Sequence, residues 1–278
     1  MTYQNYTALS VAVTNGVAYV TLDNGPINLM DMTMLLDLDR VGRELQADAA
    51  VKVVVLQSAN PDFFVAHADL SLIQALPAEI PPREEKLGMI HAVLDRFRSM
   101  PKATIAKIEG RCRGGGSELA LACDMRFATL GKGVLGQPEV GVGIIPGAGG
   151  TVRLPRLIGR GRALEVILGC ADFSAEMAER YGYINRALPA AEIDYFVNSL
   201  AQRIAGFPAQ TIALAKQSVD AADTTLADDL AYEEQLFVQA AHSDGAKRRM
   251  AAAMDAGMQT PAMEKCCFTH IWGPLAGV

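Results

Sequence analysis

Apolar and polar residues follow strand-like spacing at the start of this 278-residue chain and helical spacing soon afterwards. Residues 8–23 alternate β-prone side chains around Asn15 and Gly16, which tolerate the positive φ of a tight hairpin turn. Apolar residues recur at helical spacing over residues 32–45, and residues 51–56 form an apolar run of the buried-strand type, interrupted only by Lys52. The pattern predicts an antiparallel hairpin, then a helix, then a buried strand.

Strand and helix patterns continue to alternate through the middle of the chain. A helical apolar stripe carries His91 beside it, as is typical of a core histidine, and ends before Met100 and Pro101. The expected elements are a helix at 87–97, a strand at 104–108, a helix at 117–122, a strand at 125–129, a glycine-rich turn entering a helix at 147–158, and a strand at 184–188.

The last third of the chain is almost wholly helical in pattern. Helices are expected at 190–204, 209–221, 226–241 and 245–256, and the residues after Gly257 have no period. No repeat or low-complexity linker divides the chain. We therefore expect a mixed core at 1–200, a helical region at 201–257 and a tail at 258–278 without an assigned conformation.

Composition limits the class of protein. Half of the residues are hydrophobic, a fifth are charged and the net charge is −6, a globular balance that argues against a broad nucleic-acid surface. No apolar run suits a membrane span, and the amino terminus has no signal-peptide or transit-peptide pattern. The odd number of cysteines, without a CxxC pair, fits a reducing compartment. We expect a cytoplasmic protein that binds neither nucleic acid nor membrane.

The chemistry predicted from the residues begins at a run of three glycines, residues 114–116, that leads from a strand into a helix. Glycines let the backbone approach a ligand closely, just where the first helical amides lack partners. Glu118 would stand in the first helical turn, where the positive helix end favours the carboxylate and hence a base. Taken alone, the motif also fits a tight turn with a capping glutamate.

Two further loops carry candidate groups. Glu139 follows Pro138 and has apolar neighbours, so desolvation would favour its acid form and suit proton donation. Ala68 and Asp69 close a loop after an apolar strand and can present another main-chain amide. Two amides aimed at one oxygen are the usual requirement for stabilising an oxyanion. The alternatives are a solvated loop glutamate, and a surface turn with Asp69 as a helix cap.

Several competing motifs fail. A literal GxGxxG at residues 131–136 is followed at once by Pro138, and the acidic residue that a nicotinamide site needs is missing. Ser117 lacks the second glycine of a nucleophile elbow, and Lys132 lacks a Walker pattern. The histidines show no metal-ligand spacing, so we predict no metal site. They are His67, His91, His242 and His270.

Together the three loops resemble the crotonase superfamily, also called the enoyl-CoA hydratase and isomerase family. The resemblance covers about residues 8–220 and includes GPINLM, VKVVVLQS, FFVAHADL, IAKIEGRCRGGGSELALACDMRFA, GQPEVGVGIIPGAGGTVRLPRLIG and AERYGYINRAL. It implies an α/β fold, a spiral of strand, strand, helix units that binds acyl-CoA thioesters. It also implies a helical carboxyl-terminal region that assembles a homotrimer or homohexamer.

The resemblance implies roles for matching residues. The amides of Ala68 and Gly115 would form an oxyanion hole for the thioester carbonyl. Glu118 would activate water for attack at the β-carbon, and Glu139 would protonate the α-carbon of a 2-enoyl-CoA. Coenzyme A is part of the substrate, so no separate cofactor is expected. Other residues expected to bind substrate are Ala66, His67, Asp69, Leu70, Gly114, Pro138 and Gly147.

Two departures from the family pattern matter. His67 stands where the common motif has glycine; we expect its imidazole to point outward, with ligand contact or titration near neutral pH as the alternative. The tail after Gly257 is longer than expected, so no CoA contact is assigned to it. The expected activity is enoyl-CoA hydration. The alternatives are an isomerase, another crotonase-type hydrolase, lyase or decarboxylase, or a noncatalytic acyl-CoA-binding scaffold.

Overall fold

A computed structural model describes residues 2–77, 79 and 87–268 of the chain. Its strands are β1 (Leu9–Thr14), β2 (Val17–Leu22), β3 (Val53–Ser58), β4 (Phe63–Val65), β5 (Ala103–Ile108), β6 (Arg111–Arg113), β7 (Met125–Thr129), β8 (Val134–Gly136), β9 (Phe173–Ser174) and β10 (Arg186–Leu188). Its α-helices are α1 (Met32–Ala47), α2 (Leu70–Gln74), α3 (Met89–Ser99), α4 (Gly115–Ala122), α5 (Gly150–Ile158), α6 (Arg160–Gly169), α7 (Ala175–Tyr181), α8 (Ile193–Ala205), α9 (Ala209–Asp220), α10 (Leu226–His242) and α11 (Asp244–Asp255).

The amino-terminal hairpin is confirmed. β1 and β2 pair antiparallel from Leu9 opposite Leu22 to Thr14 opposite Val17. Asn15 and Gly16 connect them with φ of 50° and 81°. Two positive φ angles in a two-residue connection match the right-handed twist of the strands, which explains why these residue types stand here.

The strands form two sheets, in the orders β1-β2-β3-β5-β7-β10 and β4-β6-β8-β9. From β2 to β10 the larger sheet is parallel. After β3 and after β5, the chain adds one strand to the smaller sheet and then passes through helices, α2 and α3 in the first case and α4 in the second, before it returns to the larger sheet. This repeated strand, strand, helix unit confirms the predicted spiral.

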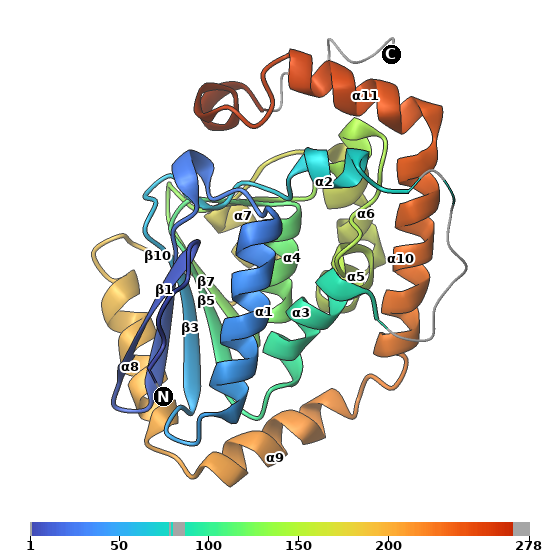
Figure 1. Cartoon of the computed structure of the whole chain (residues 1–278). Helices are drawn as coiled ribbons and strands as arrows, with labels where there is room; N and C mark the ends of the chain where they lie inside the picture. Colours follow the sequence, from blue (N-terminus) through green and yellow to red (C-terminus); the bar gives the residue numbers. More distant parts are fainter. Residues whose placement is uncertain (1, 78, 80–86, 269–278) are drawn as a thin grey trace.

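Helices cover both faces of the larger sheet (Figure 1). On one face, Val55 and Ile105 pack with Val197 of α8. On the other, apolar side chains of α1, α3 and α4, such as Leu38 and Leu94, join the main core. The strands that both layers bury are the continuous apolar runs in the sequence, as expected for parallel strands covered on both sides.

The carboxyl-terminal helices were predicted, while several other elements were not. The four expected helices correspond to α8, α9, α10 and α11, and α10 lies beside α5 (Figure 1). α6, α7 and the two- and three-residue strands of the smaller sheet had no assigned pattern. The tail, left without a conformation, forms a π-helical turn at Met263–Cys267. In the described part of the chain, no helix is long and apolar enough to cross a membrane.

Candidate active site

The loop between β4 and α2 presents the amide of Ala68. Met30 N donates to His67 O at 2.9 Å, and Asp69 N donates to Met30 O at 3.0 Å, which makes a parallel bridge between Met30 and Ala68. In such a bridge the amide of the central residue points away from its partner. Ala68 faces Gly115 instead, because a β-carbon on Gly115 would lie 3.4 Å from Ala68 N. The two predicted amides are therefore neighbours.

The glycine run is required by close packing. Gly114 has φ of 49° and ψ of −125°, and a β-carbon there would lie 2.6 Å from Glu139 Oε1. A β-carbon on Gly116 would lie 2.5 Å from Val65 O. Gly115 begins α4, so its amide has no acceptor within the helix. Among the described residues, neither Ala68 N nor Gly115 N donates a hydrogen bond.

Glu118 is buried in α4 but does not cap its own helix. Its Oε1 accepts hydrogen bonds from Ala148 N at 2.7 Å and Gly150 N at 2.8 Å, on the loop that enters α5. Burial, and then the nearby charge of Glu233, raise the pKa of Glu118 to about 7, although the two amides act in the opposite direction. Both protonation states are therefore accessible near neutral pH.

Glu139 begins the 3₁₀ turn η2 (Glu139–Val142) and is half-buried. Burial, followed by the charge of Glu118, raises the pKa of Glu139 well above its ordinary value. In the orientation that satisfies its neighbours, the Gln137 amide donates to Glu139 at 3.1 and 3.3 Å. Because Glu118 carries two backbone amides on one oxygen, we infer that it ionises first.

These groups share one cavity of about 480 Å³, lined by Ala68, Gly115, Glu118 and Glu139. Much of the remaining lining is apolar and includes Met30, Met32, Leu35, Leu72, Ile73, Leu76, Met89, Ile90, Ile144, Phe237 and Val238. A larger cavity, of about 660 Å³, lies beside α9, but neither glutamate lines it. The smaller cavity is the one that joins titratable groups to unpaired amides.

The predicted substrate-binding residues lie in different places. Asp69 and Gly147 line the cavity, and Asp69 also caps α2 by accepting from Ser71 N at 2.9 Å, the alternative role that the sequence left open. The others are absent from its lining. Ala66, Leu70, Gly114 and Pro138 are buried around it.

His67 corrects an expectation, because its imidazole does not point outward. The residue is 4% exposed. Its Nδ1 lies 2.8 Å from Ala68 O, and its Nε2 lies 3.0 Å from Glu264 Oε1. The sequence could not show this burial, because the partner is 197 residues away on the tail.

Glu233 and His91 complete the surroundings of Glu118. Glu233 of α10 accepts from Gly149 N at 2.5 Å, Thr151 N at 2.7 Å and Val152 N at 3.1 Å. His91 Nε2 lies 3.1 Å from Glu233 Oε2, the oxygen that accepts from Gly149 N. Glu233 thus holds the loop whose amides hold Glu118. Sequence analysis missed it because one glutamate inside an amphipathic helix carries no local signal.

A sequence profile of the enoyl-CoA hydratase/isomerase family matches residues 12–259. The chain belongs to this family. In the described ranges, no group of three or more His, Cys, Asp or Glu side chains is placed to hold a metal ion.

Known members of the enoyl-CoA hydratase/isomerase family align over most of the chain. A short-chain-enoyl-CoA hydratase from Clostridium acetobutylicum is 33% identical over 242 residues, which cover 86% of this chain and 91% of that protein. A candidate enoyl-CoA hydratase from Streptomyces avermitilis has a crystal structure that matches with a TM-score of 0.88 and 38% identity, over 99% of this chain and all of the other. A fatty acid oxidation complex α subunit from Shewanella halifaxensis is 36% identical over 63% of this chain, which spans only 25% of that subunit.

Proposed function

We propose that this protein is an enoyl-CoA hydratase-like enzyme that adds water reversibly to a 2-enoyl-CoA thioester. The observation that carries the proposal is the shared cavity. Two carboxyl groups of different acidity, Glu118 and Glu139, line it together with Ala68 and Gly115, whose amides have no acceptor among the described residues. Membership of the enoyl-CoA hydratase/isomerase family supports the same reaction.

The proposed reaction uses each group once. The thioester oxygen accepts from Ala68 N and Gly115 N, which draw negative charge onto it as the enolate forms. The Glu118 carboxylate takes a proton from water while the water oxygen bonds to the β-carbon. The enolate then takes a proton from Glu139 at the α-carbon. One water molecule is added, and a proton must return from Glu118 to Glu139 before the next turnover.

The amide contacts of Glu118 support its part as the base. They occupy Oε1, and among the described residues no hydrogen bond is made to Oε2, which can meet the water. Burial and then the charge of Glu118 raise the pKa of Glu139, which favours its protonated form when Glu118 is ionised. The apolar lining suits a hydrocarbon acyl chain. Coenzyme A would enter with the substrate, so the proposal includes no separate cofactor.

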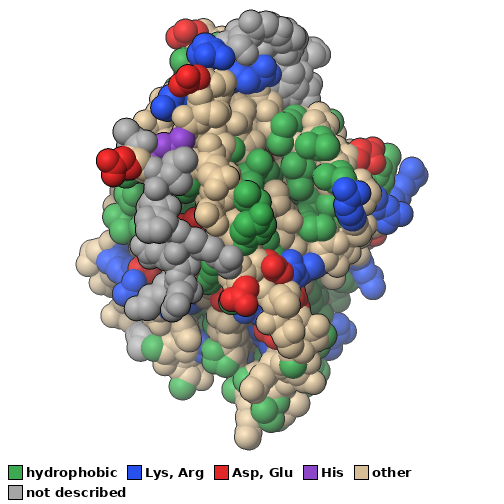
Figure 2. Space-filling model, turned by 90° about the vertical axis from the view of Figure 1, so that its right-hand side faces the viewer, with side chains coloured by type: hydrophobic (Ala, Val, Ile, Leu, Met, Phe, Trp, Pro, Cys, Tyr) green, Lys and Arg blue, Asp and Glu red, His purple; other side chains and the backbone are tan. Residues whose placement is uncertain are grey.

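We also propose a cytoplasmic homotrimer or homohexamer assembled through the helical region past residue 200. Exposed apolar side chains support this assembly. Leu214 and Val219 on α9 are 55% and 74% exposed, and Tyr232 on α10 is 51% exposed. Hydrophobic side chains gather on the face of the molecule where α10 lies (Figure 2). Patches of this kind are common where subunits pack.

The proposed reaction can be tested with purified protein and a panel of short, medium, branched and aromatic 2-enoyl-CoAs. Loss of the conjugated-thioester absorbance reports hydration. Glu118→Gln and Glu139→Gln should each lose most turnover but still bind ligand in calorimetry. The exposed Glu179→Gln serves as the matched control and should keep full activity.

Three results would contradict the proposal. Full activity in either active-site variant would remove the proposed base and acid roles. Movement of the double bond without net hydration would favour an isomerase. Tight binding without conversion of any thioester would favour a noncatalytic scaffold.

A further inference from the structure

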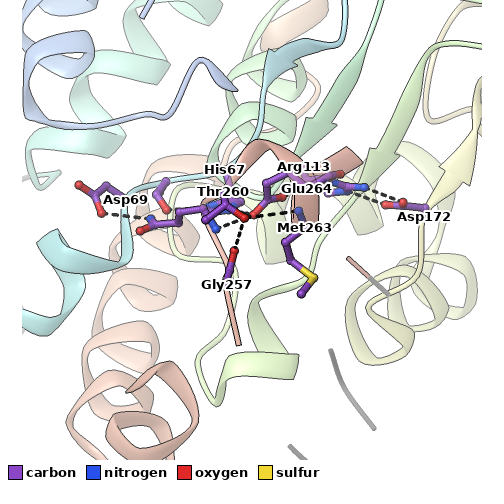
Figure 3. Close-up of polar contacts among 10 residues, drawn as sticks. His67, Asp69, Arg113, Asp172, Gly257, Thr260, Met263 and Glu264 are labelled. Carbon is purple, nitrogen blue, oxygen red and sulfur yellow. Dashed lines mark hydrogen bonds and ion pairs between the residues drawn. The ribbon is translucent and has the colours of Figure 1, made fainter. Parts of the chain in front are cut away.

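The tail after α11 returns to the two segments that present the paired amides. These are the loop of Ala68, between β4 and α2, and the end of β6 that leads to Gly115. Glu264 lies on the π-helical turn of this tail and is fully buried, with 0% of its surface exposed. Figure 3 shows its carboxylate between His67, on the loop of Ala68, and Arg113, at the end of β6. A buried carboxylate is costly unless it is paired and hydrogen-bonded, and Glu264 has such partners on both oxygens.

One oxygen of Glu264 contacts the loop of Ala68. Its Oε1 lies 3.0 Å from His67 Nε2 and accepts from Gln259 N at 2.9 Å. The other ring nitrogen of His67 lies 2.8 Å from Ala68 O. The imidazole thus connects the backbone of Ala68 to the tail.

The other oxygen of Glu264 contacts the strand that leads to Gly115. Its Oε2 lies 3.3 Å from Arg113 Nη1, which also donates to Glu264 O at 3.2 Å. The rest of the Arg113 guanidinium donates to both oxygens of Asp172 at 2.6 and 2.7 Å. Arg113 is 2% exposed and is the last residue of β6, two positions before Gly115. It is therefore fixed on both sides.

Four polar side chains follow one another along this line. His67 and Arg113 face the carboxylates of Glu264 and Asp172 (Figure 3). Burial alone would raise the pKa of Glu264, but the hydrogen bond and charge of His67, with the charge of Arg113, lower it below the ordinary value. Glu264 is therefore an anion at neutral pH.

Two other residues of the tail make polar contacts nearby. Gln259 Nε2 donates to Asp69 Oδ1 at 3.1 Å, next to Ala68. Lys265 pairs with Asp62, and its carbonyl accepts from Arg111. Asp62 precedes β4 and Arg111 begins β6, so the contacts of Lys265 lie at the opposite ends of these strands from Ala68 and Gly115.

The two loops also touch each other directly. A β-carbon on Gly114 would lie 3.3 Å from His67 Cβ, and one on Gly115 would lie 3.2 Å from Ala68 Cβ. The spacing of the two amides therefore depends on how His67 and Arg113 are held. Within the described residues, Glu264 is the one side chain that has polar contacts with both, and the ring of Phe268 also lies near both.

We propose that Glu264 is a positioning residue for the oxyanion hole, tying the loop of Ala68 to the strand that leads to Gly115. Donors must lie about 2.7–3.1 Å from the developing oxyanion, so a small change in spacing weakens both bonds. The inference rests on the proposed function only in assuming that the two amides receive a thioester carbonyl.

The kinetic test compares Glu264→Gln with Lys265→Gln in the full-length protein. Glu264→Gln keeps the side-chain size but loses the charge and one acceptor oxygen. Because misplacement by about 1 Å can cost on the order of a hundredfold, we expect kcat to fall by roughly ten- to a hundredfold while KM changes less than about threefold. Lys265→Gln removes a neighbouring charge that touches neither His67 nor Arg113, so it should keep wild-type kcat.

Coupling is measured with a double variant. His67→Gln should cost about as much as Glu264→Gln, and the pair together should cost little more than either alone, because both break one linkage. Independent losses that multiply would overturn the proposed tie between the two residues. If Glu264→Gln does not fold, His67→Gln alone carries the test, because it leaves the contact between Glu264 and Arg113 in place.

A spectroscopic readout separates this inference from the proposed hydration. The infrared carbonyl stretch of butyryl-CoA, which has no double bond to hydrate, should move to lower frequency on binding the wild-type protein. The shift should shrink in Glu264→Gln and persist in Lys265→Gln. A folded Glu264→Gln protein that binds butyryl-CoA with the full shift would overturn the inference. If the shift behaves as expected but no enoyl-CoA is hydrated, the proposed function fails and the positioning role stands.

Discussion

Glu118 should limit the rate of hydration below neutral pH. The perturbation is a change of pH from 8 to 6, and the magnitude follows from the acidity of this side chain. Burial, with the charge of Glu233, raises the pKa of Glu118 from 4.5 to about 7. The carboxylate fraction is then roughly nine tenths at pH 8 and roughly one tenth at pH 6. We expect kcat/KM to fall about tenfold over this interval, because the base must be ionised.

The sign of this effect separates Glu118 from Glu139. A base with a raised pKa loses activity as the pH falls through about 7, whereas a proton donor loses it as the pH rises. The pKa of Glu139 is raised well above its ordinary value. The decline of activity at alkaline pH, the alkaline limb of the profile, should therefore lie at higher pH than the decline at acid pH, the acid limb. The two declines in the pH profile give apparent pKa values that belong to the coupled pair of glutamates.

The assay measures initial rates of absorbance loss from pH 5.5 to pH 9 at subsaturating 2-enoyl-CoA. Glu179→Gln is the control and should reproduce the wild-type profile. A base with an ordinary glutamate pKa would be almost fully ionised over the whole interval. A profile that is flat between pH 8 and pH 6, or that rises towards pH 6, would therefore refute this account of Glu118.

Two further predictions concern the surroundings of the same carboxylate. Glu118→Gln should raise the urea midpoint relative to wild type at pH 8 but not at pH 5. The raised folded-state pKa gives stability that is complete below 4.5 and is lost as the pH rises through about 7, by up to about 3 kcal/mol; the same difference at both pH values would contradict it. Glu233→Gln should lower kcat by about tenfold or more, because an amide group replaces a carboxylate that accepts from Gly149, Thr151 and Val152. It should also move the acid limb of the pH profile to lower pH, because a negative charge beside Glu118 is removed; an unmoved limb in an active variant would count against the coupling.

Periodic and local features of the fold were predictable from sequence. The hairpin turn at Asn15 and Gly16 needs positive φ at both positions, and the buried parallel strands β3 and β5 are mostly apolar. The strands β6, β8 and β9 have two or three residues, too few to show a period. α6 was missed because only Gly159 separates it from α5, so the two helices lack a clear boundary in the pattern.

The candidate site was predictable where its groups lie in local motifs. Glu118 and Glu139 each accompany a glycine-rich turn whose close packing requires glycine, and the structure brings both to one cavity. The supporting contacts depend on long-range folding instead. Glu233 bonds to an amide 84 residues away, and Glu264 to an imidazole 197 residues away. No spacing along the chain could indicate either contact.

The most direct test of the central claim is isotopic labelling of the product. The wild-type enzyme is incubated with a 2-enoyl-CoA in water enriched in ¹⁸O, and separately in D₂O, and the thioester product is analysed by mass spectrometry. We predict a 3-hydroxyacyl-CoA with one ¹⁸O on the β-carbon, and in D₂O one carbon-bound deuterium on the α-carbon. A thioester product without ¹⁸O, or a free acid that carries the label in its carboxyl group, would contradict the claim.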